Sequence, residues 1–121
     1  MRAFKTHYFQ RWARSARLTD AALRKAVEEM AAGLIDADLG GGIIKKRVAL
    51  PGRGKSGGAR TIVATNRSGH WFFLFGYEKN VLDNIGDKAL RALQDAGADL
   101  LALDDNDLAQ AMNAGELLEI A

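Results

Sequence analysis

The chain has 121 residues, of which 48% are hydrophobic and 26% are charged, and it contains no cysteine. A chain of this length is expected to form one domain with a core of its own, and the lack of cysteine excludes disulfides and thiolate metal sites. No apolar run approaches the roughly 20 residues that span a bilayer, and the N-terminal residues lack the apolar core of a signal peptide. We therefore expect one domain over residues 1–121, located in the cytoplasm and without a membrane partner.

The net charge of +2 conceals an uneven distribution along the chain. Residues 1–80 contain 15 Lys and Arg against 6 Asp and Glu, whereas residues 81–121 contain 2 against 9. One interpretation is a solvated surface that is merely uneven. The other is a basic face for a polyanion, followed by an acidic helical extension from about residue 99. The cations that cluster within residues 43–79 favour the second interpretation.

The first part of the chain predicts a short strand and two helices. Residues 2–4 suit a strand, and apolar residues then recur at helical spacing from about residue 6 and again from residue 21. Thr19 and Asp20 offer an N-cap for the second helix, and Gly33 is suited to follow its end. Together these helices predict a hairpin packed on one face of a sheet.

The middle of the chain predicts an antiparallel meander. Residues 36–42 include three consecutive glycines and predict a loop. Residues 43–50 predict a strand with Lys45 and Arg47 on one side and Lys46 and Val48 on the other. Residues 60–66 and the aromatic run at 70–77 predict the next two strands. The expected core includes Val48, Ile62, Val63, Phe73 and Phe75.

The last part of the chain predicts two more helices, at residues 81–98 and from residue 104 to about 115, with Asp87 as a candidate N-cap. Residues 117–120 predict a terminal strand or a packed tail. The whole pattern predicts an α+β fold. We expect a small antiparallel sheet of three to five strands, an N-terminal helical hairpin on one of its faces, and C-terminal helices.

A glycine-rich loop at residues 51–59 matches two nucleotide-binding patterns only in part. Residues 52–57 fit GxGxxG, and residues 54–56 resemble the end of a phosphate-binding loop. Both motifs need a helix to follow them, whereas here a strand follows, so we reject both. What remains is a hairpin loop with Arg53 and Lys55 at its tip, suited either to approach a phosphate or to keep the surface soluble.

Three pieces of sequence together resemble the RelE/HigB family of bacterial toxins. They are KKR at residues 45–47, PGRGKSGGART at 51–61 and FGYEKN at 75–80. The resemblance extends to about residue 98. It implies a toxin that cleaves mRNA, commonly on the ribosome, as an endoribonuclease without a metal or other cofactor. It also implies inhibition by a cognate antitoxin from a neighbouring gene, and the basic face of the toxin suggests that an acidic antitoxin segment covers it.

The resemblance also implies which residues act. Catalytic roles fall on Arg53, Lys55, Arg60 and Lys79. The tyrosine that the family carries near its C-terminus has no clear match, and Tyr77 is the candidate substitute. RNA binding is expected from Lys45, Lys46 and Arg47.

Those residue types suit attack by a ribose 2′-hydroxyl on its own 3′ phosphate. Arginine holds phosphate oxygens in bidentate fashion, a lysine crowded by cations has a lowered pKa and can act as base, and a tyrosine or lysine can supply a proton. Two alternatives stay open at this point. One is a ParE-like toxin that binds a topoisomerase and is not a nuclease, and the other is a non-catalytic RNA-binding domain.

Overall fold

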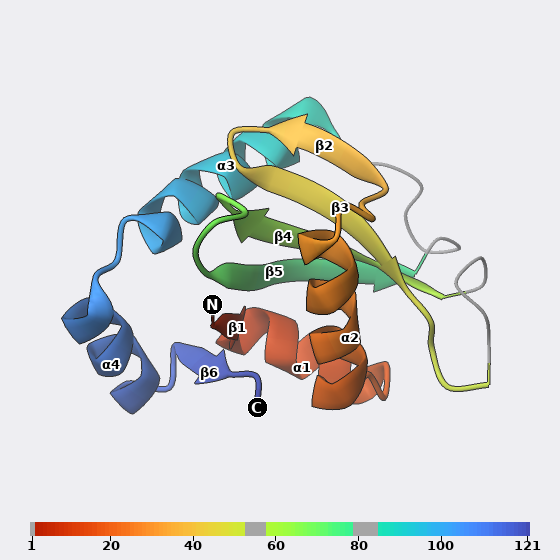
Figure 1. Cartoon of the computed structure of the whole chain (residues 1–121), viewed down its shortest axis with the longest axis horizontal. Coiled ribbons are helices and arrows are strands. Elements are labelled where there is room, and N and C mark those ends of the chain that lie inside the picture. The colour runs from red at the N-terminus through yellow and green to blue at the C-terminus, as the bar shows by residue number, and fades with distance from the viewer. Residues whose placement is uncertain (1, 53–57, 79–84) are drawn as a thin grey trace.

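The computed structural model describes residues 2–52, 58–78 and 85–121. Within them, six strands form one sheet in the order β2-β3-β4-β5-β1-β6, and four helices pack on its two faces (Figure 1). The strands are β1 (Ala3–Thr6), β2 (Ala37–Gly40), β3 (Ile43–Val48), β4 (Ala59–Thr65), β5 (Trp71–Glu78) and β6 (Leu117–Glu119). The helices are α1 (His7–Ser15), α2 (Asp20–Ala31), α3 (Asp87–Leu101) and α4 (Asp105–Asn113).

The predicted α+β class, helical hairpin and C-terminal helices are confirmed, but the sheet is larger than expected and is not wholly antiparallel. Strand β1 lies between β5 and β6 and pairs with β5 in parallel. The predicted loop at residues 36–42 contains β2, which pairs with β3. The composition of β2 is that of a loop, so its strand conformation depends on the hydrogen bonds that the β3 edge offers.

The hairpin of α1 and α2 covers one face of the sheet, and α2 crosses in front of the strands in Figure 1. The side chains of Thr6 and Thr19 cap the two helices by accepting hydrogen bonds from Phe9 N and Ala22 N. Gly33 follows α2 with φ of 95°, as the sequence predicts. The buried side chains of this layer include Phe9, Leu23, Met30, Ile44, Val48, Val63 and Phe73.

Helices α3 and α4 cover the other face, where the core includes Phe4, Ile43, Ile62, Phe72 and Leu108. Helix α3 approaches the sheet closely at Gly97, because a Cβ there would lie 2.8 Å from Ile43 Cδ1. Asp87 is the first residue of α3 rather than its cap. The N-cap is Gly86, which has no side chain that could accept a hydrogen bond from the first turn. The negative charge of Asp87 still interacts favourably with the positive end of the helix dipole. Residues 81–84 of that predicted helix lie outside the described residues.

The five predicted core residues are divided between the two layers. Val48, Val63 and Phe73 are buried on the α1–α2 side, whereas Ile62 is buried and Phe75 half-buried on the α3–α4 side. Among the helices of the described residues, none is both long enough and apolar enough to cross a membrane.

A bulge in β5 determines which way the end of that strand faces. Ile62 pairs with Phe75 and Val63 pairs with Phe73, so Leu74 has no partner on β4. After the bulge, Phe75 and Tyr77 both contact the core of the α3–α4 side. Gly76 faces α1 instead, where an added Cβ would lie 2.2 Å from the indole of Trp12. The bulge therefore shifts Phe75 and Tyr77 to the α3–α4 face, although Phe73, two residues before Phe75, faces α1 and α2.

Candidate active site

Three neighbouring strands bring Arg47, Arg60 and Tyr77 into one row. Arg47 on β3 is the partner of Arg60 on β4, and Arg60 is the partner of Tyr77 on β5. Because side chains alternate along a strand, Lys45 lies on the same face one step along β3. We refer to Lys45, Arg47, Arg60 and Tyr77 as the candidate site. It lies on the α3–α4 side of the sheet, at the end where β3 leads into the glycine-rich loop and β4 begins.

Arg60 is a buried cation. The residue is 9% exposed, and its guanidinium donates a hydrogen bond of 3.4 Å to the backbone carbonyl of Gly58. No carboxylate of the described residues forms an ion pair with it. A charge held away from water is costly unless an opposite charge meets it, and it acts on an incoming anion more strongly than it would in water. Arg60 is therefore placed to bind an anionic group such as a phosphate.

Tyr77 lies beside Arg60 with its hydroxyl buried. The residue is 4% exposed, and its hydroxyl oxygen has no hydrogen-bond partner among the described residues. Burial raises the pKa of Tyr77 above its ordinary value, and the nearby positive charge of Arg60 offsets only part of that shift. The phenol is thus protonated at neutral pH. In that form it can donate a hydrogen bond or a proton, and it cannot serve as a base.

Lys45 and Arg47 complete the cationic edge of the site. Lys45 is half-buried, while Arg47 is exposed and bound to Asp36 through its backbone N–H at 2.6 Å and its Nε at 2.9 Å. Partial burial alone would raise the pKa of Asp36, but the hydrogen bonds and charge of Arg47 outweigh it and hold that pKa below its ordinary value. Asp36 therefore stays ionised, fixes Arg47 and neutralises part of its charge.

Lys46 is not brought to the candidate site, although the sequence suggests that it binds RNA with its neighbours. Its side chain is 5% exposed and lies on the α1–α2 side. There its Nζ pairs with Glu29 at 2.8 Å and donates to the backbone carbonyl of Leu34 at 2.9 Å. This buried contact ties α2 to β3, so the position of Lys46 favours a structural role.

The other predicted catalytic residues, Arg53, Lys55 and Lys79, lie outside the described residues. In the sequence they flank β4 and β5, the two strands that carry Arg60 and Tyr77. Their roles remain predictions from the sequence.

An aromatic contact that the sequence did not reveal adjoins the site. The ring of Tyr8, at the start of α1, stacks on Phe75 with centroids 6.0 Å apart and an angle of 14° between the planes. The Phe75 ring in turn lies 5.9 Å from that of Tyr77. Tyr8 is 61% exposed. The one signal in the sequence is that Tyr8 falls off the apolar stripe of α1, which does not show what it contacts.

Comparison with known proteins assigns the family. The family model for the RelE toxin of the RelE/RelB toxin–antitoxin system matches residues 1–120. The chain belongs to the RelE toxin family. The resemblance seen in the sequence extends only to about residue 98, whereas the family model also includes the acidic part that follows. A search of the curated proteins finds no match to this chain. Family membership makes the protein the toxin of a toxin–antitoxin pair and implies a cognate antitoxin.

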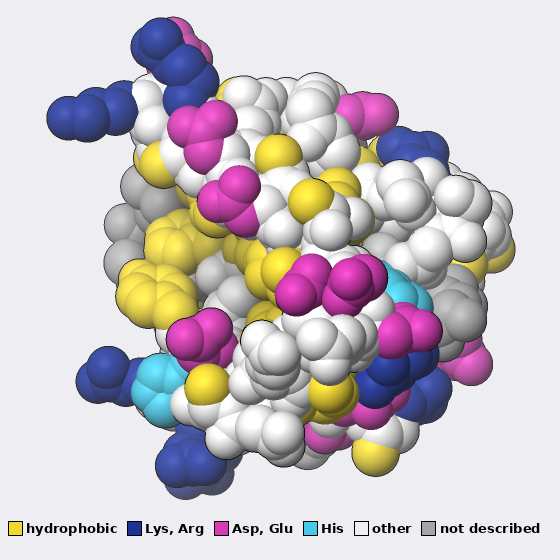
Figure 2. Space-filling view, turned by 90° about the vertical axis from the view of Figure 1, so that its left-hand side faces the viewer, with side chains coloured by type: hydrophobic (Ala, Val, Ile, Leu, Met, Phe, Trp, Pro, Cys, Tyr) yellow, Lys and Arg dark blue, Asp and Glu magenta, His cyan; other side chains and the backbone are white. Residues whose placement is uncertain are grey.

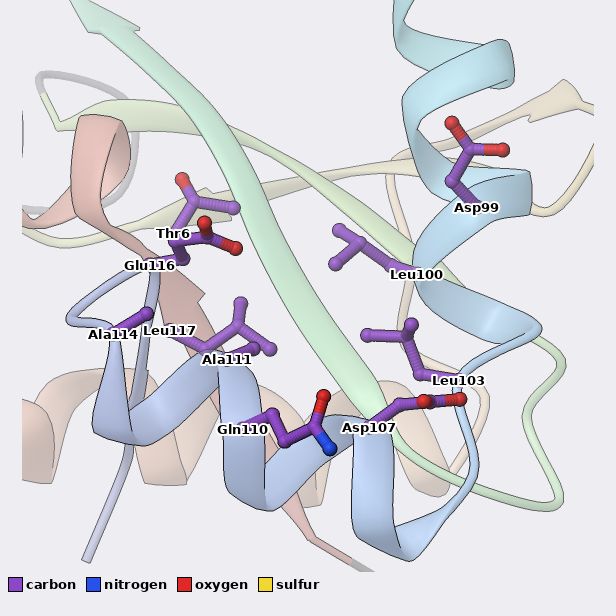
Figure 3. Close-up of a pocket in the computed structure, with 10 residues that line it drawn as sticks. All are labelled: Thr6, Asp99, Leu100, Leu103, Asp107, Gln110, Ala111, Ala114, Glu116 and Leu117. Atoms are coloured by element: carbon purple, nitrogen blue, oxygen red, sulfur yellow. The ribbon is translucent and has the colours of Figure 1, made fainter.

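A cleft of about 490 Å³ opens on the same side of the RelE-family toxin, between α3, α4 and the start of α1. In Figure 3, β5 passes behind this cleft, Leu100 and Leu103 enter it from the α3 side, and Ala111 and Leu117 lie opposite them. Its rim carries Asp99, Asp107 and Glu116. Figure 2 looks onto this side of the molecule and shows acidic side chains around a hollow with apolar walls. The toxin therefore has a cationic site and an acidic cleft on one face.

Proposed function

We propose that this toxin is an endoribonuclease that cleaves mRNA, on the ribosome, and thereby inhibits translation. The observation that carries the proposal is that the buried guanidinium of Arg60 lies beside the protonated phenol of Tyr77. Among the described residues, no carboxylate forms an ion pair with this guanidinium. Transesterification of a phosphate requires a cation that stabilises the charge on the phosphate oxygens and a donor that protonates the leaving oxygen.

The reaction begins with attack of a ribose 2′-oxygen on the adjacent phosphorus. The O2′–P bond forms, the P–O5′ bond breaks, and the negative charge on the non-bridging oxygens rises in between. Arg60 stabilises that charge, and Tyr77 gives its proton to the departing 5′-oxygen. The products are a 2′,3′-cyclic phosphate and a free 5′-hydroxyl.

The remaining steps use residues proposed from the sequence. Lys55, which has Arg53 and Arg60 near it in the sequence, takes the proton of the 2′-hydroxyl, and Arg53 and Lys79 add positive charge around the phosphate. Lys45 and Arg47 bind neighbouring phosphates of the RNA backbone. Bidentate contact favours arginine over lysine at the position that holds the reacting phosphate.

The deciding experiment compares Arg60→Ala with Lys25→Ala. Lys25 is an exposed cation on α2, on the opposite face, with no hydrogen bond or ion pair to the described residues. Loss of a preorganised donor to the transition state costs on the order of 10²-fold or more in rate, whereas loss of one remote cation weakens RNA binding slightly. We therefore expect Arg60→Ala to abolish single-turnover cleavage of ribosome-bound mRNA and Lys25→Ala to leave it within about threefold of the parent.

Mapping of RNA ends after induction, with and without translating ribosomes, separates this proposal from its alternatives. New 5′-hydroxyl ends that require ribosomes support it. Intact RNA together with an inhibited topoisomerase would identify a ParE-like toxin, and intact but bound RNA would identify a binding domain. Equal and small defects in the two variants would remove the case for an active site.

A further inference from the structure

The acidic cleft is unsuited to the RNA that the candidate site attracts. Asp99, Asp107 and Glu116 on its rim repel phosphates, and none of the three forms an ion pair with a described residue. The walls are apolar, formed by Leu100, Leu103, Ala111 and Leu117. A cleft with apolar walls and a negatively charged rim fits an amphipathic segment that carries positive charge.

Two of the rim acids are placed against the local preference of their helices. Asp99 lies in the last turn of α3, and Glu116 follows the end of α4 by three residues. Helix C-termini favour cations, and neither helix has a basic residue in its last turn. Asp107, in contrast, is accounted for by the capping box that it forms with Asp104. The carboxylates of Asp99 and Glu116 therefore contribute nothing evident to the fold.

The cleft also has the size and the position of a docking groove. Its volume of about 490 Å³ falls within the range of roughly 300–1,000 Å³ over which proteins enclose a ligand. Its apolar walls belong to the same core cluster as Phe75 and Tyr77. A segment seated in the cleft would thus lie on the same face of the sheet as the candidate site, and it would contact none of the four candidate-site residues among those that line the cleft.

We propose that this cleft is the docking site of a basic amphipathic segment of the cognate antitoxin. Its apolar side chains enter between Leu100, Leu103 and Leu117, and its Lys or Arg side chains meet Asp99 and Glu116. Such a segment would bind as a helix laid in a groove. The occupant follows from charge complementarity and from the partner that the family implies. The proposal does not rest on nuclease activity.

This assignment gives the antitoxin two kinds of contact. The basic surface of the toxin suits an acidic segment, while the cleft suits a basic one. Two linked contacts of opposite sign raise the overall affinity, since the second is made within the complex. They also fix the direction in which the antitoxin chain runs across the toxin.

The test is a double charge reversal, Asp99→Lys with Glu116→Lys, with Glu28→Lys as its matched control. Both target side chains are exposed, and Glu28 is an exposed acid on α2, on the other face of the sheet. Calorimetry with the purified full-length toxin and the antitoxin from the neighbouring gene measures the Kd. Like charges placed opposite each other in an interface repel, so we expect the double variant to bind at least about 100-fold more weakly. The control should bind within about threefold of the parent.

Three further readouts make the result specific. The double variant should melt no lower than the parent, because it removes carboxylates from two helix C-termini. Reversal of the basic residues in the antitoxin segment to Glu should restore binding to the double variant. Co-expressed antitoxin should rescue growth from the parent toxin and not from the double variant.

An unchanged Kd for the double variant overturns the proposal, whether or not the toxin cleaves RNA. Loss of self-association in light scattering, with antitoxin binding unaffected, would assign the cleft to a second copy of this chain instead. Loss of cleavage by the double variant with normal antitoxin binding would likewise overturn it, by placing the cleft in substrate binding. Failure of the proposed nuclease activity would show in the RNA-end maps and leave the calorimetric result intact.

Discussion

Substitution of Tyr77 by Phe should raise stability and lower activity together. The hydroxyl of Tyr77 is buried and has no partner among the described residues, so folding removes it from water without compensation. Such a group costs about 1–3 kcal/mol. Phenylalanine keeps the ring contacts with Phe75 and deletes only the oxygen, and the lost dispersion contacts of one atom offset a small part of the gain.

The expected net gain is about 1 kcal/mol in the free energy of unfolding, which corresponds to a rise in Tm of about 3–6 °C for a chain of this size. The cleavage rate should fall by about 10²-fold, which is typical for loss of a positioned proton donor. Thermal unfolding by circular dichroism measures the first effect, and single-turnover cleavage of ribosome-bound mRNA measures the second. The matched control is Tyr8→Phe, whose hydroxyl belongs to an exposed side chain and should leave the Tm unchanged.

Two results would refute this reasoning. A lower Tm for Tyr77→Phe would mean that the hydroxyl has a stabilising partner. A higher Tm with an unchanged cleavage rate would leave Tyr77 as a strained core residue without a role in the chemistry. The ionisation of Tyr77 supplies an independent check. Since burial raises its pKa, its phenolate absorbance should appear only above the ordinary pH of about 10, and activity should not decline below that pH through this group.

Three further predictions concern the surroundings of the site. Lys46→Ala should destabilise the toxin by about 1.5–3 kcal/mol in urea unfolding, because it removes a buried ammonium that binds Glu29 and the Leu34 carbonyl. Lys45→Ala should weaken RNA binding with no loss of stability, and the reverse pattern would contradict the placement of the two lysines. Asp36→Asn should cost about 0.5–1 kcal/mol at pH 7 and nothing at low pH, measured by urea unfolding across pH. Its folded pKa is lowered, so its contribution is present above the unfolded pKa of about 4 and is lost as pH falls through the folded value; a cost that persists in acid would exclude the ion pair as its source. Gly76→Ala should lower stability by about 1–3 kcal/mol by displacing Trp12, and a neutral result would show that the indole moves at little cost.

The parts of the fold that depend on local patterns were predictable from the sequence. Strands β4 and β5 are runs of β-branched and aromatic residues, and the caps of α1 and α2 are threonines followed by helical spacing. The parallel pairing of β1 with β5 was not predictable, because nothing in four residues near the N-terminus indicates which distant strand they join. Strand β2 was missed for a related reason, since it depends on β3 and not on its own composition.

The candidate site was predictable in its charges and not in its geometry. Alternation along β3 already separated Lys45 and Arg47 from Lys46, and that pattern alone indicated that the three cations do not share one surface. The contact of Tyr77 with Arg60 was hidden, because every residue from Trp71 to Phe75 is apolar and alternation leaves no trace in such a run. The sequence predicted an acidic helical extension from about residue 99, and it did not show that the apolar residues of this part form the walls of a cleft.

Because Leu74 has no partner on β4, the spacing of residues along β5 does not by itself show which face Tyr77 occupies. Phe73 faces α1 and α2, yet Phe75 and Tyr77 face α3 and α4, because their pairs with Ile62 and Arg60 on β4 fix their direction. Deletion of Leu74 would turn the bulge into a regular ladder and leave Tyr77 beside Arg60. A relative whose strand is one residue shorter at this point would carry the same tyrosine on the same face, so the pairing with β4, and not the distance from Trp71, identifies the equivalent residue.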